Sequence, residues 1–429
     1  MRKLKESGYG YLGTVPEDWK LERIKNHLRF SPEKNPGGAR VLSLYREYGV
    51  IPKDSRDDNH NVTSEDTSNY RYVRVGDFVV NKMKAWQGSM AVSEYEGVVS
   101  PAYYVYSFTS NEIDRRYLHY LLRSKCYAEE FRRLSAGIRI GQWDLPKSGF
   151  ESTYLSIPPI IEQQKIADKI AEQKKKVERL IINVQTQIEK LQTYKQNVIT
   201  EVVTKGLDSS VKFEESGVEW VGSVPSHWKP IQLKYCTYIR ARLGWKGLKA
   251  DEYVEEGFPL LSAFNIQNSK LDFSEVNYIS QFRYDESPEI KLSLNDILLV
   301  KDGAGIGKCA IVEELPIEST TNGSLAVITI TDALVPKYLY YYFLSVYFQK
   351  FIDRIKDGMG VPHLFQSDLR EIRVIIPSKP EQLSAIEFLD KKCACIDQLI
   401  ALKQAKIEKL EQYKKSLIYE YVTGKKEVS

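Results

Sequence analysis

The sequence predicts a mixed α/β (α+β) fold in which two globular domains are separated by two long helices. Two observations support this prediction: a short segment that occurs twice, and two long segments in which apolar residues recur with helical spacing. The chain has 429 residues, of which 42% are hydrophobic, so it is long enough for two or three domains with their own cores. We place the globular domains at residues 1–157 and 207–376, and the helical segments at 158–206 and 377–429.

The repeated segment opens each globular domain. Residues 7–20 match residues 216–229, with seven of fourteen positions identical at an offset of 209. The shared pattern is Gly-x-Val-Pro-x-x-Trp, which ends at Trp19 in the first copy and at Trp228 in the second. This repeat predicts two related units and an internal pseudo-two-fold relation between the halves of the chain.

The two helical segments also match each other. Segment 157–163, which contains Ile-Pro followed by Glu-Gln, aligns with 376–382 at an offset of 219. Apolar residues then recur mainly at steps of three, four or seven, which is typical of one stripe along a helix, close to a heptad seam. The residues expected to pack in this stripe are Ile166, Ile170, Val177, Ile188 and Leu191 in the first helix, and Leu389, Ile396, Leu399, Ile407 and Leu410 in the second.

Prolines before both helices, and Gly206 and Gly424 after them, mark where the helices begin and end. Each helix is about 40 residues long, or roughly 60 Å. A single helix of that length would leave its apolar stripe exposed, so we expect the two helices to form an antiparallel intramolecular coiled coil. The alternatives are a seam with a second chain, or two ordinary surface helices.

Within the globular domains, β-rich segments alternate with turns that contain glycine. Shorter helices are predicted over 115–134 and 336–355. The predicted strands are 72–75, 77–80, 103–108, 297–300 and 325–330.

Charge and cysteine content exclude several classes of protein. The formal net charge is +4, so a nucleic-acid surface, if present, must be local. The five cysteines are scattered and form no paired CxxC motifs, which predicts a reducing, cytoplasmic compartment and no metal site. No apolar run of about 18 residues occurs, and no apolar core follows the first charges, so we expect neither a membrane span nor a secretory signal.

No motif of catalysis is recognisable. Segment 301–309 is the best candidate for a phosphate-binding loop, but Asp302 stands where a Walker loop needs Gly, and Cys309 stands where it needs Ser or Thr. It is expected to be a Gly-rich turn after strand 297–300 instead. Ile157–Ile160 lacks the acid or amide and the aromatic residue of an amino-methyltransferase loop, and the five histidines indicate no triad. The sequence therefore predicts a chain without its own catalytic site.

The ordered, doubled motifs resemble the DNA-specificity (S) subunit of type I restriction–modification enzymes over nearly the whole chain. The paired Gly-x-Val-Pro-x-x-Trp openings carry the resemblance, together with the paired Pro-x-x-x-Glu-Gln starts of the helices and twin Ile-Glu-Lys-Leu-x-x-Tyr-Lys segments at 188–195 and 407–414. Asn81–Gly88 with Ser100–Tyr103 resembles one class of target-recognition domain, and Lys301–Lys308 resembles another.

The resemblance implies a function for each part. Each globular domain is then a target-recognition domain that reads one half of a bipartite, asymmetric site in double-stranded DNA. The helices fix the spacer between the half-sites and hold two methyltransferase (modification) subunits, and motor-nuclease (restriction) subunits complete the complex. The chain itself is expected to be non-catalytic and to bind no cofactor, with S-adenosylmethionine, ATP and Mg²⁺ in the partner subunits.

The candidate DNA-contacting residues are cations, amides and aromatics that follow strands or lie on Gly-bounded loops. Arg and Lys bind guanine and phosphate, and Gln binds adenine. The candidates are Lys82, Lys84, Trp86, Gln87, Arg139 and Gln142 in the first domain, and Lys301, Lys308, Asn322, His363 and Gln366 in the second.

Other roles remain open for several of these residues. Trp86 and its companion Trp143 are as well explained as core residues, whereas Trp19 and Trp228 are expected to dock the domains on the helices. Asn81–Gly88 has no recognisable twin in the second domain, which predicts two different half-sites.

Three alternative functions stay open. The first is the specificity subunit of a type II-like system whose partner carries a fused nuclease and methyltransferase. The second is an enzyme with an unrecognised site, and the third is a coiled-coil adaptor without a DNA role.

Overall fold

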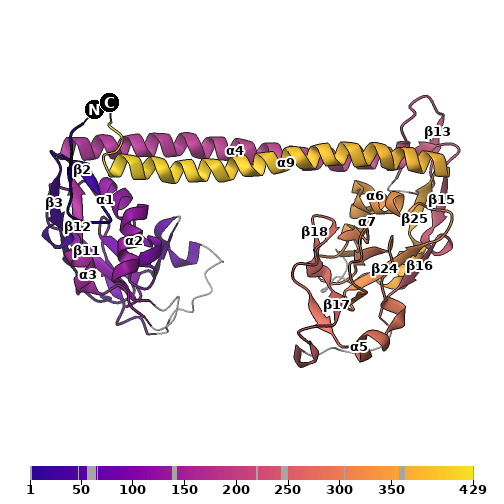
Figure 1. The fold of residues 1–429 in the computed structure, drawn as a ribbon, viewed down its shortest axis with the longest axis horizontal. Coiled ribbons are helices and arrows are strands. Elements are labelled where there is room, and N and C mark those ends of the chain that lie inside the picture. The colour runs from indigo at the N-terminus through magenta and orange to yellow at the C-terminus, as the bar shows by residue number, and fades with distance from the viewer. Residues whose placement is uncertain are drawn as a thin grey trace. The chain divides into compact units, whose positions relative to one another are not determined.

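The computed structural model describes residues 2–46, 48–55, 64, 66–137, 143–218, 221–242, 250–303, 305–356 and 363–428. The chain divides into two compact units: Met1–Gln185 with Ala405–Ser429, and Thr186–Gln404. The long helices α4 (Ile160–Lys205) and α9 (Lys379–Val422) each contribute one end to each unit (Figure 1). No helix in the described part of the chain is long and apolar enough to cross a membrane.

The first unit is built on a four-stranded antiparallel sheet with the order β4-β11-β8-β9. Two-stranded pairs β1-β2, β3-β12, β5-β6 and β7-β10 surround it. Its strands are β1 (Leu4–Glu6), β2 (Thr14–Pro16), β3 (Lys20–Arg23), β4 (Leu28–Phe30), β5 (Leu42–Tyr45), β6 (Gly49–Pro52), β7 (Arg71–Val73), β8 (Phe78–Asn81), β9 (Met90–Val92), β10 (Gly97–Val99), β11 (Tyr103–Phe108) and β12 (Tyr154–Ile157). Its short helices are α1 (Arg115–Leu122), α2 (Lys125–Leu134) and α3 (Lys147–Ser152).

The second unit has a matching four-stranded sheet with the order β16-β24-β21-β22. The pairs β13-β14, β15-β25 and β18-β19 and the three-stranded sheet β20-β17-β23 complete it. Its strands are β13 (Phe213–Glu215), β14 (Ser223–Pro225), β15 (Lys229–Gln232), β16 (Thr237–Arg240), β17 (Phe258–Leu261), β18 (Ile266–Gln267), β19 (Lys270–Leu271), β20 (Asn277–Ile279), β21 (Ile297–Val300), β22 (Cys309–Ile311), β23 (Thr320–Thr321), β24 (Leu325–Ile330) and β25 (Arg373–Ile376). Its short helices are α5 (Gln281–Asp285), α6 (Pro336–Leu344), α7 (Val346–Lys356) and α8 (Gln366–Glu371).

The two units repeat one topology, which confirms the internal repeat. The opening hairpins β1-β2 and β13-β14 correspond, as do the pairs β3-β12 and β15-β25, and the two four-stranded sheets match strand for strand. The predicted strands overlap β7, β8, β11, β21 and β24.

The prediction of a single helix over 115–134, and of another over 336–355, is wrong in one respect: each range contains two helices. Ser124 separates α1 from α2, and Ser345 separates α6 from α7. Both serines have extended backbone angles, and each hydroxyl donates to the carbonyl three residues earlier at 2.7 Å. A serine hydroxyl that bonds to the local backbone competes with helix continuation.

Within each unit, the long helices pair in antiparallel fashion. In the first unit, Ile166 and Ile170 near the start of α4 share a core with Leu417 and Tyr421 near the end of α9. In the second unit, the end of α4 packs against the start of α9 through Ile199, Val202, Val203, Ala385, Leu389 and Cys393. Start-to-end pairing in both units confirms the predicted antiparallel coiled coil.

Most of the predicted stripe is buried, but Leu399 does not belong to it. Val177, Ile188 and Ile396 are buried, and Leu191, Ile407 and Leu410 are half-buried. Leu399 is 42% exposed, whereas its neighbour Ile400 is half-buried. From Ile396 the seam therefore advances by four residues instead of three, and both steps fit a 3.6-residue turn.

The repeated tryptophans dock each globular domain on the ends of both long helices. The indole of Trp19 donates to Glu162 in the first turn of α4 at 3.3 Å, and that of Trp228 donates to Glu381 in the first turn of α9 at 2.9 Å. The glycine after the other helix lies against the same ring: Gly424 for Trp19, and Gly206 for Trp228. Both glycines have positive φ angles. The docking role expected for the tryptophans follows from these contacts.

The glutamine that follows each of these glutamates joins the long helix to the segment just before a short helix of the domain, α1 in the first unit and α6 in the second. The buried amide of Gln163 accepts from the backbone N–H of Asp114 at 2.9 Å and donates to the carbonyls of Glu112 and Pro158. Gln382 makes the corresponding bonds with Val335, Ala333 and Pro377. Thus both residues of the Glu-Gln motif are structural.

Replacing Gly424 by Ala is expected to destabilise the first unit. At φ +70°, a Cβ there would lie 2.4 Å from Pro16 Cγ and 3.1 Å from the Trp19 ring. We expect a loss of about 1–3 kcal/mol in the free energy of unfolding, measured by urea denaturation. Gly323→Ala is the control, because Gly323 has no neighbour within 4 Å and should change stability by less than about 0.5 kcal/mol. Equal effects of the two substitutions would contradict this account of the dock.

Glu381 should make stability depend on pH in the acid range. Burial alone would raise the pKa of this carboxyl, but hydrogen bonds from Ser378, Trp228 and His227 outweigh it and lower the pKa from 4.5 to about 2. Such a group stabilises the fold above its unfolded pKa, and the contribution is lost as pH falls through the folded pKa. The side chain is 36% exposed, so solvent screening reduces the effect to about 1–2 kcal/mol.

The measurement is denaturant unfolding of Glu381→Gln and the unsubstituted chain between pH 7 and pH 2. The variant should be less stable at pH 7, and the gap should close between about pH 4.5 and pH 2. Glu408→Gln, at an exposed position of α9, is the control and should leave no such gap. A gap that does not vary with pH would show that the carboxylate charge is not what holds Trp228.

Candidate nucleic-acid interface

The candidate residues that the structure describes lie mainly where the central strands β8 and β21 end, and these two places are equivalent. The first residue after each strand is a lysine, Lys82 or Lys301. Its carbonyl accepts from Leu145 N–H at 3.0 Å in the first unit and from Leu364 N–H at 2.8 Å in the second. Each of these pairs is related by the same offset of 219 residues (301 − 82 and 364 − 145).

This equivalence corrects the prediction that Asn81–Gly88 has no counterpart. The N–H of Asn81 donates to the carbonyl of Ser89 at 3.0 Å, and the N–H of Val300 donates to that of Lys308 at 2.8 Å. Both turns contain a glycine with positive φ at the matching position, Gly88 at +77° and Gly307 at +88°. The two turns occupy one place in the fold, although their sequences differ.

In the first unit, the lysine is paired with an acid from a distant segment. Lys82 Nζ lies 2.9 Å from Asp144 Oδ2, and both side chains are partly exposed. The hydroxyl of Tyr104 donates to the Leu145 carbonyl at 3.2 Å, and burial, followed by the nearby Asp144 charge, raises the Tyr104 pKa, so this donor keeps its proton. A partly exposed ion pair is worth at most about 1 kcal/mol, so a phosphate or a guanine edge can replace Asp144 at small cost.

An aromatic and cationic cluster lies beside this pair. The rings of Trp86 and Trp143 are 5.5 Å apart, and Arg132 lies over the Trp143 ring at 5.6 Å. Both tryptophans are half-buried, so neither is fully a core residue nor a free surface residue. Lys84 is exposed and Gln87 is half-buried in the same turn. Arg139 and Gln142 fall outside the described residues.

In the second unit, the equivalent lysine has a different set of neighbours. Lys301 Nζ lies 3.1 Å from Asp302 Oδ2 on the next residue. The other oxygen of Asp302 contacts the imidazole of His363, whose ring stacks edge-on against Phe365 with centroids 4.4 Å apart. His363 occupies the position equivalent to Asp144 (363 − 144 = 219). The acid that pairs with the lysine therefore comes from a distant segment in the first unit and from the turn itself in the second.

The remaining predicted residues of this unit differ in their exposure and in their hydrogen bonds. Lys308 is exposed, and Gln366 is half-buried as the first residue of α8. Asn322 accepts two hydrogen bonds from Ser324, at 3.0 Å from its N–H and 2.5 Å from its hydroxyl, so it stabilises the turn beside Lys301. The carbonyl of Ser324 accepts from the Lys301 N–H at 2.9 Å.

Asp144, Arg132 and Asp302 were not among the sequence candidates. Asp144 contacts the candidate Lys82, Asp302 contacts the candidates Lys301 and His363, and Arg132 contacts Trp143, the companion of Trp86. The offset of 219 would have led from His363 to Asp144. No signal in the sequence indicates the contact between Arg132 and Trp143, because it depends on how α2 packs.

Comparison with known proteins gives one family. The family model of the type I restriction modification DNA specificity domain matches residues 16–191 and again residues 241–412. The specificity subunit of the type I restriction enzyme MjaVIII from Methanocaldococcus jannaschii is 25% identical over 422 residues, which cover 96% of this chain and 93% of the relative. The EcoKI specificity subunit of Escherichia coli K12 is 23% identical over 208 residues, 48% of this chain and 44% of the relative.

Two solved structures share the fold. The HsdS subunit from Thermoanaerobacter tengcongensis matches with a TM-score of 0.51 at 15% identity, over 98% of this chain and 99% of that one. A chain from a structure describing complex assembly and conformational transition of the type I R-M system matches with a TM-score of 0.68 at 13% identity, over 95% of this chain and 98% of that one. With both halves matched by the same family model, the chain belongs to the family of type I restriction–modification DNA specificity domains.

Proposed function

We propose that the chain is the non-catalytic, DNA-reading subunit of a type I restriction–modification complex, in which each globular domain reads one half of a bipartite, asymmetric site. The observation that carries the proposal is the pair of equivalent strand ends with unlike neighbours. Lys82 and Lys301 hold the same backbone position, but one is paired with Asp144 and flanked by tryptophans, and the other is paired with Asp302 and flanked by His363. One scaffold with two side-chain sets suits two different half-sites.

The proposal extends to the partners. The long helices set the spacer between the half-sites and dock two methyltransferase subunits, which supply S-adenosylmethionine chemistry, while motor-nuclease subunits use ATP and Mg²⁺. Leu180 and Ile182 of α4, and Leu399 and Leu402 of α9, are exposed apolar residues. They support a docking role for each helix, because exposed apolar side chains suit a protein partner.

Methylome sequencing of cells that express the chain with its cognate methyltransferase tests the assignment of half-sites. Lys82→Ala should relax or abolish one half of a split motif, and Lys301→Ala the other half, each at a cost of about 1–3 kcal/mol in discrimination. Lys212→Ala, an exposed lysine in the opening of the second unit, is the control and should leave the motif unchanged. A continuous motif, or loss of both halves from one substitution, would contradict the proposal.

The salt dependence of DNA binding by the assembled complex gives a second test. Lys84 and Lys308 are exposed, so they are expected to contact phosphates and to release counterions. Each alanine substitution should reduce the magnitude of the slope of log K against log salt by about 1, and affinity should fall equally for specific and unrelated DNA. A slope equal to that of the Lys212→Ala control would remove these residues from the interface.

The same experiments separate the alternatives. A single partner that both cleaves and methylates would identify a type II-like system. Methyl transfer by the purified chain alone would identify an enzyme. The absence of salt-dependent DNA binding, with partners present, would leave only the adaptor.

A further inference from the structure

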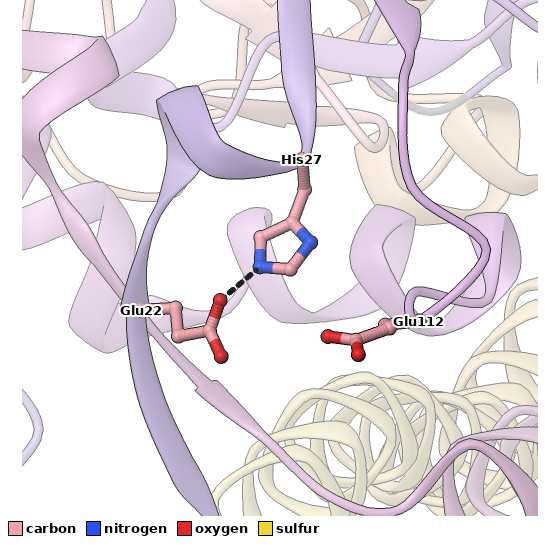
Figure 2. A group of neighbouring side chains, drawn as sticks. All are labelled: Glu22, His27 and Glu112. Carbon is pink, nitrogen blue, oxygen red and sulfur yellow. Dashed lines mark ion pairs between the residues drawn. The ribbon is translucent and has the colours of Figure 1, made fainter.

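A group of three metal-ligating side chains lies in the first unit, on segments other than the turn that follows β8. Glu22 comes from β3, His27 follows the short 3-10 helix η1 (Ile24–Asn26), and Glu112 precedes α1. One ring nitrogen of His27 and one oxygen of each carboxylate lie within 4.8 Å of one another. Figure 2 shows the imidazole and both carboxylates turned toward a common space.

His27 is buried, and its ring lacks proper hydrogen bonds. It is 2% exposed, and neither ring nitrogen has a partner with hydrogen-bond geometry. Nε2 lies 3.0 Å from Glu22 Oε2, in the contact that the dashed line in Figure 2 marks, but without hydrogen-bond geometry. The position is fixed, because the His27 N–H donates to the Ile24 carbonyl and the Thr109 N–H donates to the His27 carbonyl. A buried nitrogen without a partner is costly and rare, so it needs an explanation.

The second unit shows that the fold does not need these polar groups. Cys236 occupies the position of His27, since it donates to Leu233 and accepts from Thr331 in the same pattern. Ile231 occupies the position of Glu22, because it pairs with Val374 as Glu22 pairs with Leu155. Ala333 occupies the position of Glu112, because Gln382 bonds its carbonyl as Gln163 bonds that of Glu112. All three equivalents lack a charge, so the polar group in the first unit is a specific feature of that unit.

We propose that Glu22, His27 and Glu112 bind a first-row divalent transition metal of the Zn²⁺ class, with water completing the coordination. One imidazole nitrogen and two carboxylate oxygens favour such a metal over Mg²⁺ or Ca²⁺, which prefer oxygen alone. The absence of paired cysteine motifs predicted no metal site, but this donor set uses no thiol. Its members are 5 and 85 residues apart, which no short motif captures (27 − 22 and 112 − 27).

The geometry needs a small closure that the side chains allow. Ligands bound at about 2.1 Å lie at most about 4.2 Å apart. Any separation between that value and the 4.8 Å limit of the group must therefore shrink. Glu112 is 60% exposed, and its contact with Lys20 at 3.7 Å joins two exposed side chains. Such a pair contributes little, so Glu112 is free to turn toward His27.

The metal would reinforce the junction between the first domain and α4. Glu112 and Asp114 are held by Gln163 of α4, and β3, which carries Glu22, pairs with β12 immediately before that helix. A ligand that binds only the folded state stabilises it by RT ln(1 + c/Kd), where c is the free metal concentration, so the stabilisation grows with the logarithm of that concentration.

The test is a titration of the full chain with Co²⁺, which substitutes for the spectroscopically silent Zn²⁺. We expect one Co²⁺ per chain with visible d–d bands, displacement by Zn²⁺, and a higher melting temperature with Zn²⁺. Glu112→Gln should weaken Co²⁺ binding by about tenfold or more and abolish the thermal shift. Because Glu112 is exposed, this variant should keep the circular dichroism spectrum of the unsubstituted chain.

Glu94→Gln is the matched control, because Glu94 is an exposed glutamate of the same domain outside the group. It should bind Co²⁺ as the unsubstituted chain does. The proposal is overturned by the absence of d–d bands and thermal shift at saturating metal, or by equal affinities of Glu112→Gln and Glu94→Gln. A sulfur-to-cobalt charge-transfer band would also overturn it, because the metal would then be bound by a thiol such as the exposed Cys395.

Discussion

The contact of each repeated tryptophan with the ends of two helices is the constraint on which the architecture depends. Trp19 is held by Glu162 at the start of α4 and lies against Gly424 after α9, and Trp228 is held by Glu381 and lies against Gly206. The docking points are 44 residues apart along α4 (206 − 162) and 43 along α9 (424 − 381). Both helices are continuous, so nearly the same number of residues separates the two docking points along each helix.

This arrangement separates the contacts that hold each domain on the long helices, which are the same in both units, from the side chains of the turns, which differ. The buried tyrosines Tyr117 and Tyr338 each bond two carbonyls, one from the strand before a long helix and one from the end of the other long helix. Burial raises the pKa of both hydroxyls well above the usual value, so the donors are permanent. The turns after β8 and β21 are not part of these contacts with the long helices. Their side chains differ between the units, while their backbone hydrogen bonds are the same.

The sequence was sufficient for the parts of the fold that repeat with identity or with a clear period. The paired openings, both long helices, their antiparallel pairing and the docking tryptophans were predicted because each leaves a mark in local sequence. The equivalence of the turns was missed because residues 81–88 and 300–307 share only a lysine, an alanine and a glycine. Leu399 was misplaced because steps of three and four residues both suit a helix, and only packing chooses Ile400. The partner of Lys82 was missed because Asp144 is 62 residues away.

The differences between the units are of one kind. At equivalent positions the backbone hydrogen bonds are the same, but a charged side chain is present at one position and absent from the other. Next to β8 the acid that pairs with the lysine is Asp144, which is 62 residues further along the chain. Next to β21 it is Asp302, in the turn itself, and His363 stands at the position equivalent to Asp144. At the domain–helix junction, the first unit has Glu22 and His27 where the second has Ile231 and Cys236. An exposed ion pair costs little to rearrange, so the first kind of change suits recognition of a new DNA sequence. A buried imidazole whose nitrogens lack hydrogen bonds is expensive, so the second kind persists only where a ligand offsets its cost.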